Sequence, residues 1–336
     1  MIEYIQECKM DVLNFVTNEH ASFFQRQLHA LEEFGVCSDV ISPRKQFPED
    51  PQDTSRGPRD YLWMYPRIMK SQLKDYDLVH GNYGLVAPIA IAQFHRPIVL
   101  SLWGSDLYGS MEPVVQLCAK LADEVIVMNQ GMKERLRADS TVIPHGIDFD
   151  LFNPMNKAEA RRDLNWHSNK KYVLFPYPKS RELKNYSLAR EVVKGANKRI
   201  EAPIRLYRVY GEPPERMPVY MSGADVLLMT SKREGSPNSI KEALACDLPI
   251  VSTDVGDVSE RVNGVSHSYT CREQEEMVKK LVSVLEAGER TNGRSQSDEL
   301  RLDKMAKKIL NLYEKTLSEN EPTNLSCQNY SPCRTQ

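Results

Sequence analysis

The sequence predicts an α/β protein with two parallel-sheet domains that face each other across a cleft. Short runs rich in Val, Ile and Leu are apolar at consecutive positions, which is typical of strands covered on both faces. Helical stretches separate these runs, and alternating strands and helices fold as a parallel sheet between helical layers. A chain of 336 residues is long enough for two domains of ordinary size.

The first half contains four predicted strands and a clear helix. The segment from Ser22 predicts the helix, because Phe24, Leu28 and Leu31 share one face and Gly35 is a stop signal. The predicted strands are DVLNFVT from Asp11, DLVH from Asp77, PIVLSLW from Pro97 and EVIVM from Glu124.

The same alternation restarts after a polar segment, residues 155–171, so the two domains are joined near residues 147–170. We expect an N-terminal domain at 1–150, a second domain at 151–318 and a polar tail at 319–336. An amphipathic helix from Leu302 to Tyr313 ends the second domain and is free to cross back to the first. The strands predicted in the second half are YVLFPY from Tyr172, IRLYRVY from Ile204, DVLLMT from Asp225 and PIVST from Pro249.

Composition excludes several classes of protein. Lys and Arg number 44 against 46 for Asp and Glu, a net charge of −2 that argues against a nucleic-acid binder. The seven cysteines lack zinc-site spacing, so we expect reduced packing residues. No signal peptide or membrane-length apolar run is present, which predicts a cytoplasmic protein. Neither the P-loop nor the G-x-G-x-x-G phosphate motif occurs.

The stretch REGSPNSIKEALACDLPIV, from Arg233 to Val251, predicts an anion site. Ser236 is placed to cap a helix and Pro237 to occupy its first position. The free amides and the dipole at that helix start suit a diphosphate or sugar hydroxyls.

Two glutamates flank this helix start. Glu234 precedes it and Glu242 lies one turn into the helix, so both carboxylates can accept hydrogen bonds from one ligand. Taken alone, the pair has a simpler explanation, in which Glu234 complements the helix dipole and Glu242 is solvated.

The wider run MSGADVLLMTSKREGSPNSIKEALACDLPIVSTDVGD resembles the donor-binding segment of family 4 retaining glycosyltransferases, which have the GT-B fold of two Rossmann-like domains. VIPHGIDFDLFNP, from Val142, is similar to the segment that joins their domains, and LYEKTL, from Leu312, to their closing helix. The resemblance covers residues 75–318. The residues that match the donor motif are Tyr220, Ala224, Asp225, Glu234, Gly235, Pro237, Asn238, Glu242, Ala243, Ala245, Pro249, Asp254 and Gly256.

The resemblance implies roles for residues of the second domain. Glu234 would contact the transferred sugar, Glu242 the ribose, and Lys184 the diphosphate. The family's arginine before Lys184 is missing, and Lys179 or Arg181 is the candidate to replace it; a solvated loop is the alternative for this basic cluster. The helix-start residues Gly235, Ser236, Pro237 and Asn238 complete the expected donor site.

The first domain departs further from the family. Trp103 stands where many relatives have histidine, followed by Asp106 as a catalytic candidate; the alternative is a core tryptophan and a capping aspartate. His145 is expected to face the cleft on the donor side. The other acceptor-side candidates are Glu19, His20, His80 and Asn82.

The resemblance implies transfer of a sugar from a nucleoside diphosphate donor to a glycan or lipid-linked acceptor, with retained configuration. No cofactor and no metal is expected, because the D-x-D sequence at Asp148–Asp150 lies in the joining segment. A nucleotide-sugar epimerase or hydrolase and a non-catalytic protein of the same fold are the alternatives. Tyr61–Lys74 mixes aromatic and basic residues, so it is either a helix packed on its sheet or a contact with the inner membrane face.

Overall fold

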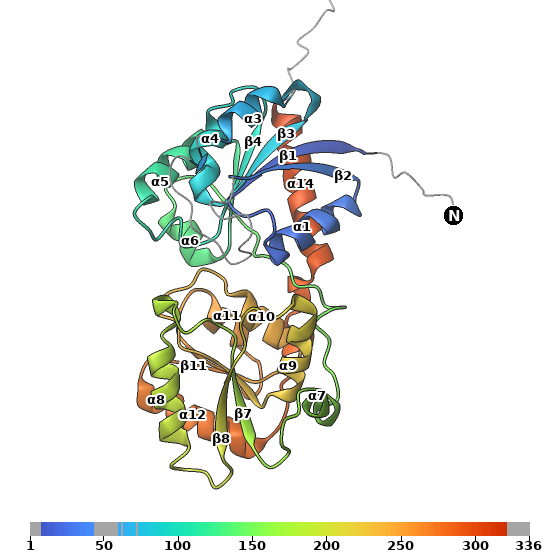
Figure 1. Ribbon diagram of the computed structural model, residues 1–336. Coiled ribbons are helices and arrows are strands. Elements are labelled where there is room, and N and C mark those ends of the chain that lie inside the picture. Colours follow the sequence, from blue (N-terminus) through green and yellow to red (C-terminus); the bar gives the residue numbers. More distant parts are fainter. Residues whose placement is uncertain (1–7, 44–59, 62, 72, 321–336) are drawn as a thin grey trace, which may run out of the picture.

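The computed structural model describes residues 8–43, 60–61, 63–71 and 73–320. Two α/β domains lie one above the other, each with a wholly parallel sheet between helices (Figure 1). The predicted fold class is therefore confirmed.

The first sheet has the strand order β2-β1-β3-β4-β5-β6. The four strands predicted in this half are present, whereas β2 and β6 were missed. β2 interrupts its apolar residues with Ser38 and Asp39, and β6 is two residues long. The strands are β1 (Met10–Val16), β2 (Val36–Ile41), β3 (Leu78–Asn82), β4 (Ile98–Leu102), β5 (Glu124–Val127) and β6 (Thr141–Val142).

The second sheet has the order β11-β10-β9-β7-β8. The chain moves outward from β7 to β8 and then crosses back to β9, so the strand order reverses between β7 and β9. Ligands of open α/β sheets bind at such a switch point, beyond the carboxyl ends of the strands. The strands are β7 (Lys171–Phe175), β8 (Ile204–Arg208), β9 (Val226–Met229), β10 (Ile250–Thr253) and β11 (Tyr269–Cys271).

The helices of the first domain before the closing helix are α1 (Ser22–Glu32), α3 (Tyr65–Lys70), α4 (Ala87–Ile91), α5 (Glu112–Leu121) and α6 (Gln130–Arg135). Those of the second domain are α7 (Lys157–Asp163), α8 (Tyr186–Ala196), α9 (Met217–Gly223), α10 (Asn238–Ala245), α11 (Val258–Val262), α12 (Gln274–Ala287) and α13 (Gly293–Gln296).

The start of α10 corrects the sequence analysis. Pro237 is the N-cap residue, one position later than predicted, and no side chain caps the helix. Ser236 instead donates its hydroxyl hydrogen to Asp257, 2.8 Å away. The first amides of α10 therefore have no side-chain acceptor, as a ligand-binding helix start requires.

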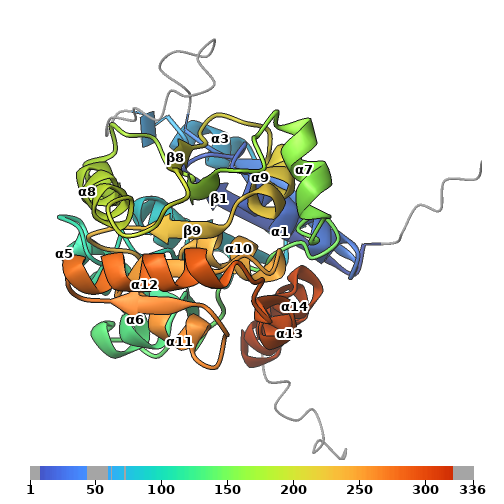
Figure 2. The same ribbon diagram turned by 90° about the horizontal axis from the view of Figure 1, so that it is seen from below.

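The last helix, α14 (Leu302–Asn320), returns to the first domain and packs beside α1 (Figures 1 and 2). Met305, Ile309 and Tyr313 are buried in the first domain's core. The predicted polar tail lies outside the described residues from residue 321 onward.

The expectation of reduced cysteines is wrong for one pair. Cys8 and Cys37 form a disulfide that ties the segment before β1 to β2. Three others, Cys118, Cys246 and Cys271, are free and buried, as predicted. Among the described helices, none combines the length and apolar content that a bilayer span needs.

Candidate active site

A cavity of about 150 Å³ lies between the two domains. Its first-domain wall is the turn after β4, and its second-domain walls are the segments after β7 and β9. It therefore occupies the switch point of the second sheet. Its lining comprises Trp103, Gly104, Ser105, Tyr108, Arg181, Leu183, Lys184, Arg233, Glu234 and Gly235.

Lys184 and Glu234 form an ion pair in this cavity, with 2.5 Å between Lys184 Nζ and Glu234 Oε1. Their side chains are only 9% and 14% exposed. Lys184 Nζ also lies 3.9 Å from the centre of the Tyr177 ring. Burial lowers the pKa of Lys184, the nearby Arg181 lowers it further, and Glu234 opposes both effects. The structure thus brings together Arg181, Lys184 and Glu234, which the sequence assigned to one site.

Glu242, in α10 of the second domain, is a second carboxyl group that the sequence assigned to the donor. Burial raises its pKa to about 7, although Arg26 and Lys241 favour the charged form. Burial, and then the charges of Glu234 and Glu242, raise the pKa of Tyr177, whose hydroxyl is hydrogen-bonded to Ser239 of α10. Tyr177 therefore lies close enough to both carboxyl groups to feel their charge. The sequence did not predict a role for this residue.

Aromatic rings from the first domain cover the joining segment at the cleft. The ring of Trp103 lies 4.9 Å from Phe23 and 5.3 Å from His145, between centres. The Trp103 Nε1 and His145 Nε2 atoms are buried without a hydrogen-bond partner, and so is Oδ1 of Asn238. Buried polar atoms are nearly always paired, so these three atoms have hydrogen-bonding capacity that a ligand could use.

His145 itself is uncharged in this setting. Burial and the nearby Lys241 lower its pKa well below the ordinary value. Lys241 donates to the His145 carbonyl oxygen over 2.8 Å, and burial lowers the Lys241 pKa to about 7. A neutral imidazole has one donor and one acceptor nitrogen, which suits a sugar hydroxyl.

Asp106 is not available as a catalytic group. Its carboxylate accepts hydrogen bonds from the backbone amides of Gly84, Trp103, Gly104 and Leu107, at 2.7 to 3.0 Å. A carboxylate with four amide donors has no free acceptor capacity, so Asp106 shapes the Trp103 turn instead.

Two acceptor-side predictions also need correction. His80 is fully buried, with its ring nitrogens 2.6 Å from the Tyr313 hydroxyl and 2.8 Å from that of Ser101. Asn82 is buried in hydrogen bonds with Asn14 and His80. His20 is exposed beside Glu19, and its acceptor role stays a prediction; Phe23, three positions later, makes the ring contacts with Trp103 and His145.

Lys179 also lies elsewhere. It lines a different cavity with residues of α8 and β8, whereas Arg181 and Lys184 line the cleft. The D-x-D sequence is a turn, in which Asp148 accepts amide hydrogens from Asp150 and Leu151. In the described part of the chain, the only cluster with metal-ligand spacing is Cys8, Asp11 and Cys37, whose two sulfurs form the disulfide.

Two glycines of the second domain, beside the cleft, leave no room for a side chain. A Cβ atom on Gly235 would lie 2.6 Å from the Trp103 carbonyl oxygen. On Gly256, whose φ is +60°, it would lie 2.2 Å from the Gly235 carbonyl oxygen. That oxygen also accepts a hydrogen bond from the Asn129 side chain of the first domain, over 2.6 Å.

We expect Gly256→Ala to lower the free energy of unfolding by about 1 to 3 kcal/mol more than Gly264→Ala does, because the new methyl group must displace backbone. Gly264 is a matched control: its φ is +76°, yet a Cβ there has no neighbour within 4 Å. Both variants pay the left-handed backbone cost. Urea unfolding measures the difference. Equal losses of unfolding free energy in the two variants would mean that the close approach at Gly256 does not restrict its side chain.

Similarity to known proteins agrees with this geometry. Sucrose-phosphate synthase from Thermosynechococcus elongatus has the same fold, with a TM-score of 0.78 and 18% identity over 93% of this chain and all of that one. HepE of Anabaena, solved with UDP and glucose, has a TM-score of 0.71 and 14% identity over 91% of this chain and all of that one. The two sheets and the cleft therefore define a protein of the GT-B fold.

The second domain is similar to a known family. Residues 181–287 match the model of the family described as glycosyl transferases group 1. A Bacillus subtilis (strain 168) protein, named putative teichuronic acid biosynthesis glycosyltransferase TuaC, is 26% identical over 60% of this chain. The chain spans 61% of that relative's length. The resemblance inferred from the donor motif to GT-B glycosyltransferases is thus confirmed.

Proposed function

We propose that this protein is a retaining glycosyltransferase of the family 4 type, which moves a sugar from a nucleoside diphosphate to an acceptor hydroxyl. The buried Lys184–Glu234 pair beside the uncapped start of α10 carries the proposal. A cation, a carboxylate and free amides lie close together there, and these are the groups that a diphosphate and its sugar would need. The TuaC name supports a role in polysaccharide or glycoconjugate synthesis.

The donor lies across the second domain in this proposal. Glu242 accepts hydrogen bonds from the ribose, Lys184 and the α10 amides hold the diphosphate, and Glu234 orients the sugar. Arg181, in the same cavity, adds positive charge as the diphosphate leaves. Trp103 and His145 offer a ring face and a ring nitrogen on the opposite wall.

Retention follows if reaction occurs on one face of the sugar. The acceptor oxygen forms its bond to the anomeric carbon on the side from which the diphosphate departs. The bond to the phosphate oxygen breaks with its electron pair, and that oxygen takes the acceptor proton. Glu234 then stabilises the positive charge on the sugar without forming a covalent bond. No cofactor or metal enters this scheme, and activity is expected to survive EDTA.

The donor site is tested first by nucleotide binding. A nucleotide at a hundred times its dissociation constant adds about 2.7 kcal/mol of stability. We expect one of UDP, GDP, ADP, CMP or dTDP to raise the melting temperature, and Glu242→Ala to abolish the shift. Glu286→Ala, which removes the same charge from an exposed position of α12, should leave it unchanged.

The alternatives give different results in the same experiment. Absence of a shift with every nucleotide would favour a non-catalytic protein of this fold. A shift accompanied by donor turnover that needs no acceptor would favour an epimerase or hydrolase. Both outcomes contradict the transferase proposal.

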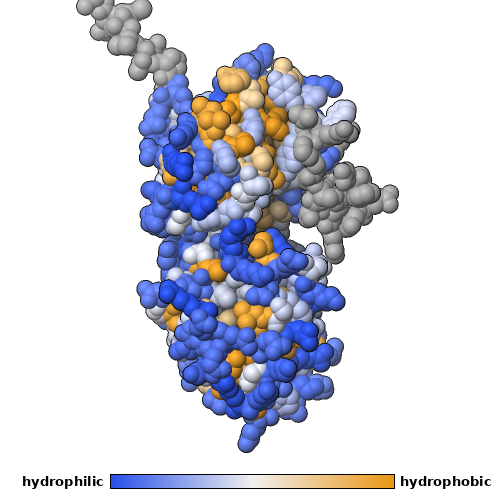
Figure 3. Space-filling view, turned by 90° about the vertical axis from the view of Figure 1, so that its left-hand side faces the viewer, coloured by the Kyte–Doolittle hydropathy of each residue, from blue (hydrophilic) through white to orange (hydrophobic). Residues whose placement is uncertain are grey.

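We also propose that the first domain rests on an anionic membrane. Hydrophobic side chains gather on one face of this domain (Figure 3). The exposed apolar residues come from α3, α4 and α5 and the segments beside them, which are neighbours in the fold. Helix α4 packs on α5, and Arg96, which follows α4, donates a hydrogen bond to the carbonyl oxygen of Leu73, which follows α3. They are Trp63, Tyr65, Met69, Phe94, Val114, Leu117 and Leu121.

Basic residues accompany these apolar ones. Lys70, Lys74 and Lys120 are exposed on the same elements, and none of them has an ion-pair partner in the described chain. Each lysine near an anionic surface contributes about 1 kcal/mol. The predicted segment at 61–74 thus contains α3, whose Ile68 packs inward while Met69 and Lys70 face solvent.

We expect the protein to sediment with vesicles that contain phosphatidylglycerol and not with pure phosphatidylcholine. Leu117→Ser/Leu121→Ser and Lys70→Gln/Lys74→Gln should each reduce the bound fraction about tenfold or more. Met155→Ser and Lys194→Gln, exposed in the second domain, are the controls. Equal binding by all variants would contradict a membrane contact at this face.

A further inference from the structure

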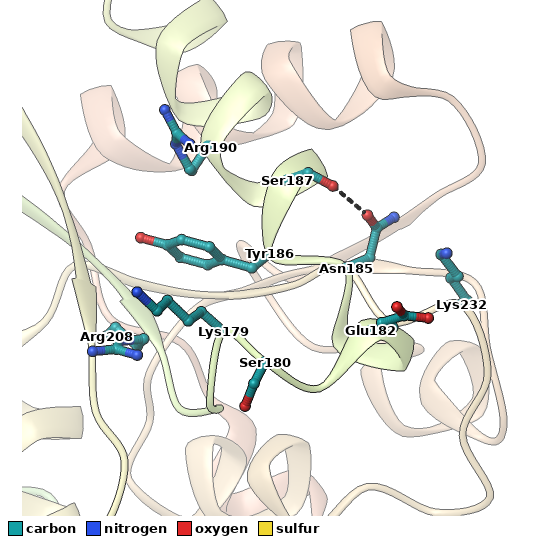
Figure 4. Close-up of a pocket in the computed structure, with 9 residues that line it drawn as sticks. All are labelled: Lys179, Ser180, Glu182, Asn185, Tyr186, Ser187, Arg190, Arg208 and Lys232. Atoms are coloured by element: carbon teal, nitrogen blue, oxygen red, sulfur yellow. Dashed lines mark hydrogen bonds between the residues drawn. The ribbon is translucent and has the colours of Figure 1, made fainter.

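A cavity of about 950 Å³ opens beside the start of α8, separate from the interdomain cleft (Figure 4). Lys179 lines it from the loop after β7, Arg190 from α8, Arg208 from the end of β8, and Lys232 from the segment after β9. Lys179 was one of two candidates, with Arg181, for the second cation at the donor diphosphate. Its position here leaves a basic cluster that the proposed transfer does not use.

The charge of this cavity is strongly positive. Four cationic side chains line it, against the single carboxylate of Glu182. None of the four forms an ion pair anywhere in the described chain, although 13 other lysine and arginine residues do. Four unpaired cations around one hollow repel each other, and an anion between them removes that repulsion.

The residue types favour a phosphate group on a polar body. Arginine presents a planar set of donors that matches phosphate oxygens, and two arginines approach from different elements. The remaining lining is polar, with hydroxyl and amide groups from Ser180, Asn185 and Ser187. Such groups bind hydroxyls, and the volume exceeds what inorganic phosphate alone would fill.

We propose that this cavity binds a phosphorylated polar ligand at a second site, distinct from the donor nucleotide. The loop from Lys179 to Lys184 connects the two sites, since one end lines this cavity and the other the cleft. Two sources supply such a group: a free sugar phosphate, or the phosphate of a lipid-borne acceptor. Helices α5 and α8 lie on the same side of the molecule in both views (Figures 1 and 2), so a membrane phosphate can reach the cavity.

Inorganic pyrophosphate is the first probe, measured by titration calorimetry while the nucleotide that raises the melting temperature saturates the cleft, because pyrophosphate also fits the diphosphate site proposed beside Lys184. We expect wild type to bind it and Arg190→Gln/Arg208→Gln to bind it at least tenfold more weakly. Arg205→Gln/Lys194→Gln is the matched control, because it removes two exposed charges from the same strand and helix outside the cavity. Its affinity should stay within about twofold of wild type.

Donor-site variants separate this inference from the proposed function. Lys184→Met should weaken nucleotide binding and preserve pyrophosphate binding, whereas the Arg190/Arg208 variant should do the reverse. Loss of pyrophosphate binding in Lys184→Met alone, or equal loss in the matched control, would overturn the proposal. So would the absence of binding to wild type, whatever the nucleotide result.

Two further titrations identify the source. Glucose 6-phosphate tests a free ligand, and vesicles with phosphatidic acid test a lipid phosphate. Binding of either one that is lost in Arg190→Gln/Arg208→Gln supports the second site and names its source. Binding of both that is unchanged in that variant would overturn it.

Discussion

Glu234→Gln is expected to reduce the rate of sugar transfer at least about 100-fold while the affinity for the donor nucleotide stays within about threefold. Glu234 lies on the sugar side of the proposed donor, and its negative charge gains importance as positive charge develops on the sugar ring. An interaction that strengthens only in the transition state changes kcat rather than ground-state binding. Steady-state release of the nucleoside diphosphate, with acceptor present, measures the effect.

The same substitution also affects stability, and this must be separated from catalysis. Removing one partner of a buried ion pair typically costs about 3 to 5 kcal/mol, because the other charge is left uncompensated. Lys184 is only 9% exposed, so Glu234→Gln should lower the free energy of unfolding. The double variant Lys184→Met/Glu234→Gln should regain much of that stability and none of the activity.

Glu286→Gln, on an exposed turn of α12, serves as the control for charge and should behave as wild type. A Glu234→Gln enzyme that retains more than half of the wild-type rate would remove Glu234 from the mechanism. An inactive variant that also fails to bind nucleotide would instead assign Glu234 to donor binding.

The second domain was predictable because its signals are local. Consecutive apolar residues fixed the positions of β7 to β10, and the ends of such strands necessarily gather at one edge of a parallel sheet. Lys184 and Glu234 follow β7 and β9 closely in the sequence, so their meeting at the switch point follows from strand order. The errors at this site are the cap of α10, which differs by a single position, and Lys179, which lines a separate cavity.

The first domain was less predictable because its polar residues depend on distant partners. His80 looks like a ligand at a strand end, but its nitrogens are bonded to Ser101 and to Tyr313, 233 positions later. Asp106 depends on the amides of a turn whose shape it determines. The role of Phe23 at the cleft could not be predicted, because an aromatic residue at a helix start is usually part of the core. The return of α14 explains the environment of His80, whereas Phe23 is placed by its contacts with Trp103 and His145.

Acidification should destabilise the protein through His80. Burial lowers the pKa of His80 to about 3, against 6.5 in the unfolded chain. The folded state therefore favours the neutral ring, and the stability from this residue is complete above pH 6.5 and is lost as the pH falls toward 3. Between pH 7 and pH 4.5 the loss is about 3 kcal/mol, since one pKa unit corresponds to 1.36 kcal/mol. Urea unfolding at a series of pH values measures it.

His80→Gln isolates this contribution from other titrating groups. Glutamine keeps a donor and an acceptor toward Tyr313 and Ser101 but cannot become charged, so the variant should be less stable at pH 7 and lose less stability on acidification. His145, also buried and neutral, titrates in both proteins and cancels in the difference. His29→Gln, at an exposed position of α1, should follow the wild-type curve. Parallel curves for wild type and His80→Gln would mean that the contact between α14 and the sheet does not depend on a neutral histidine.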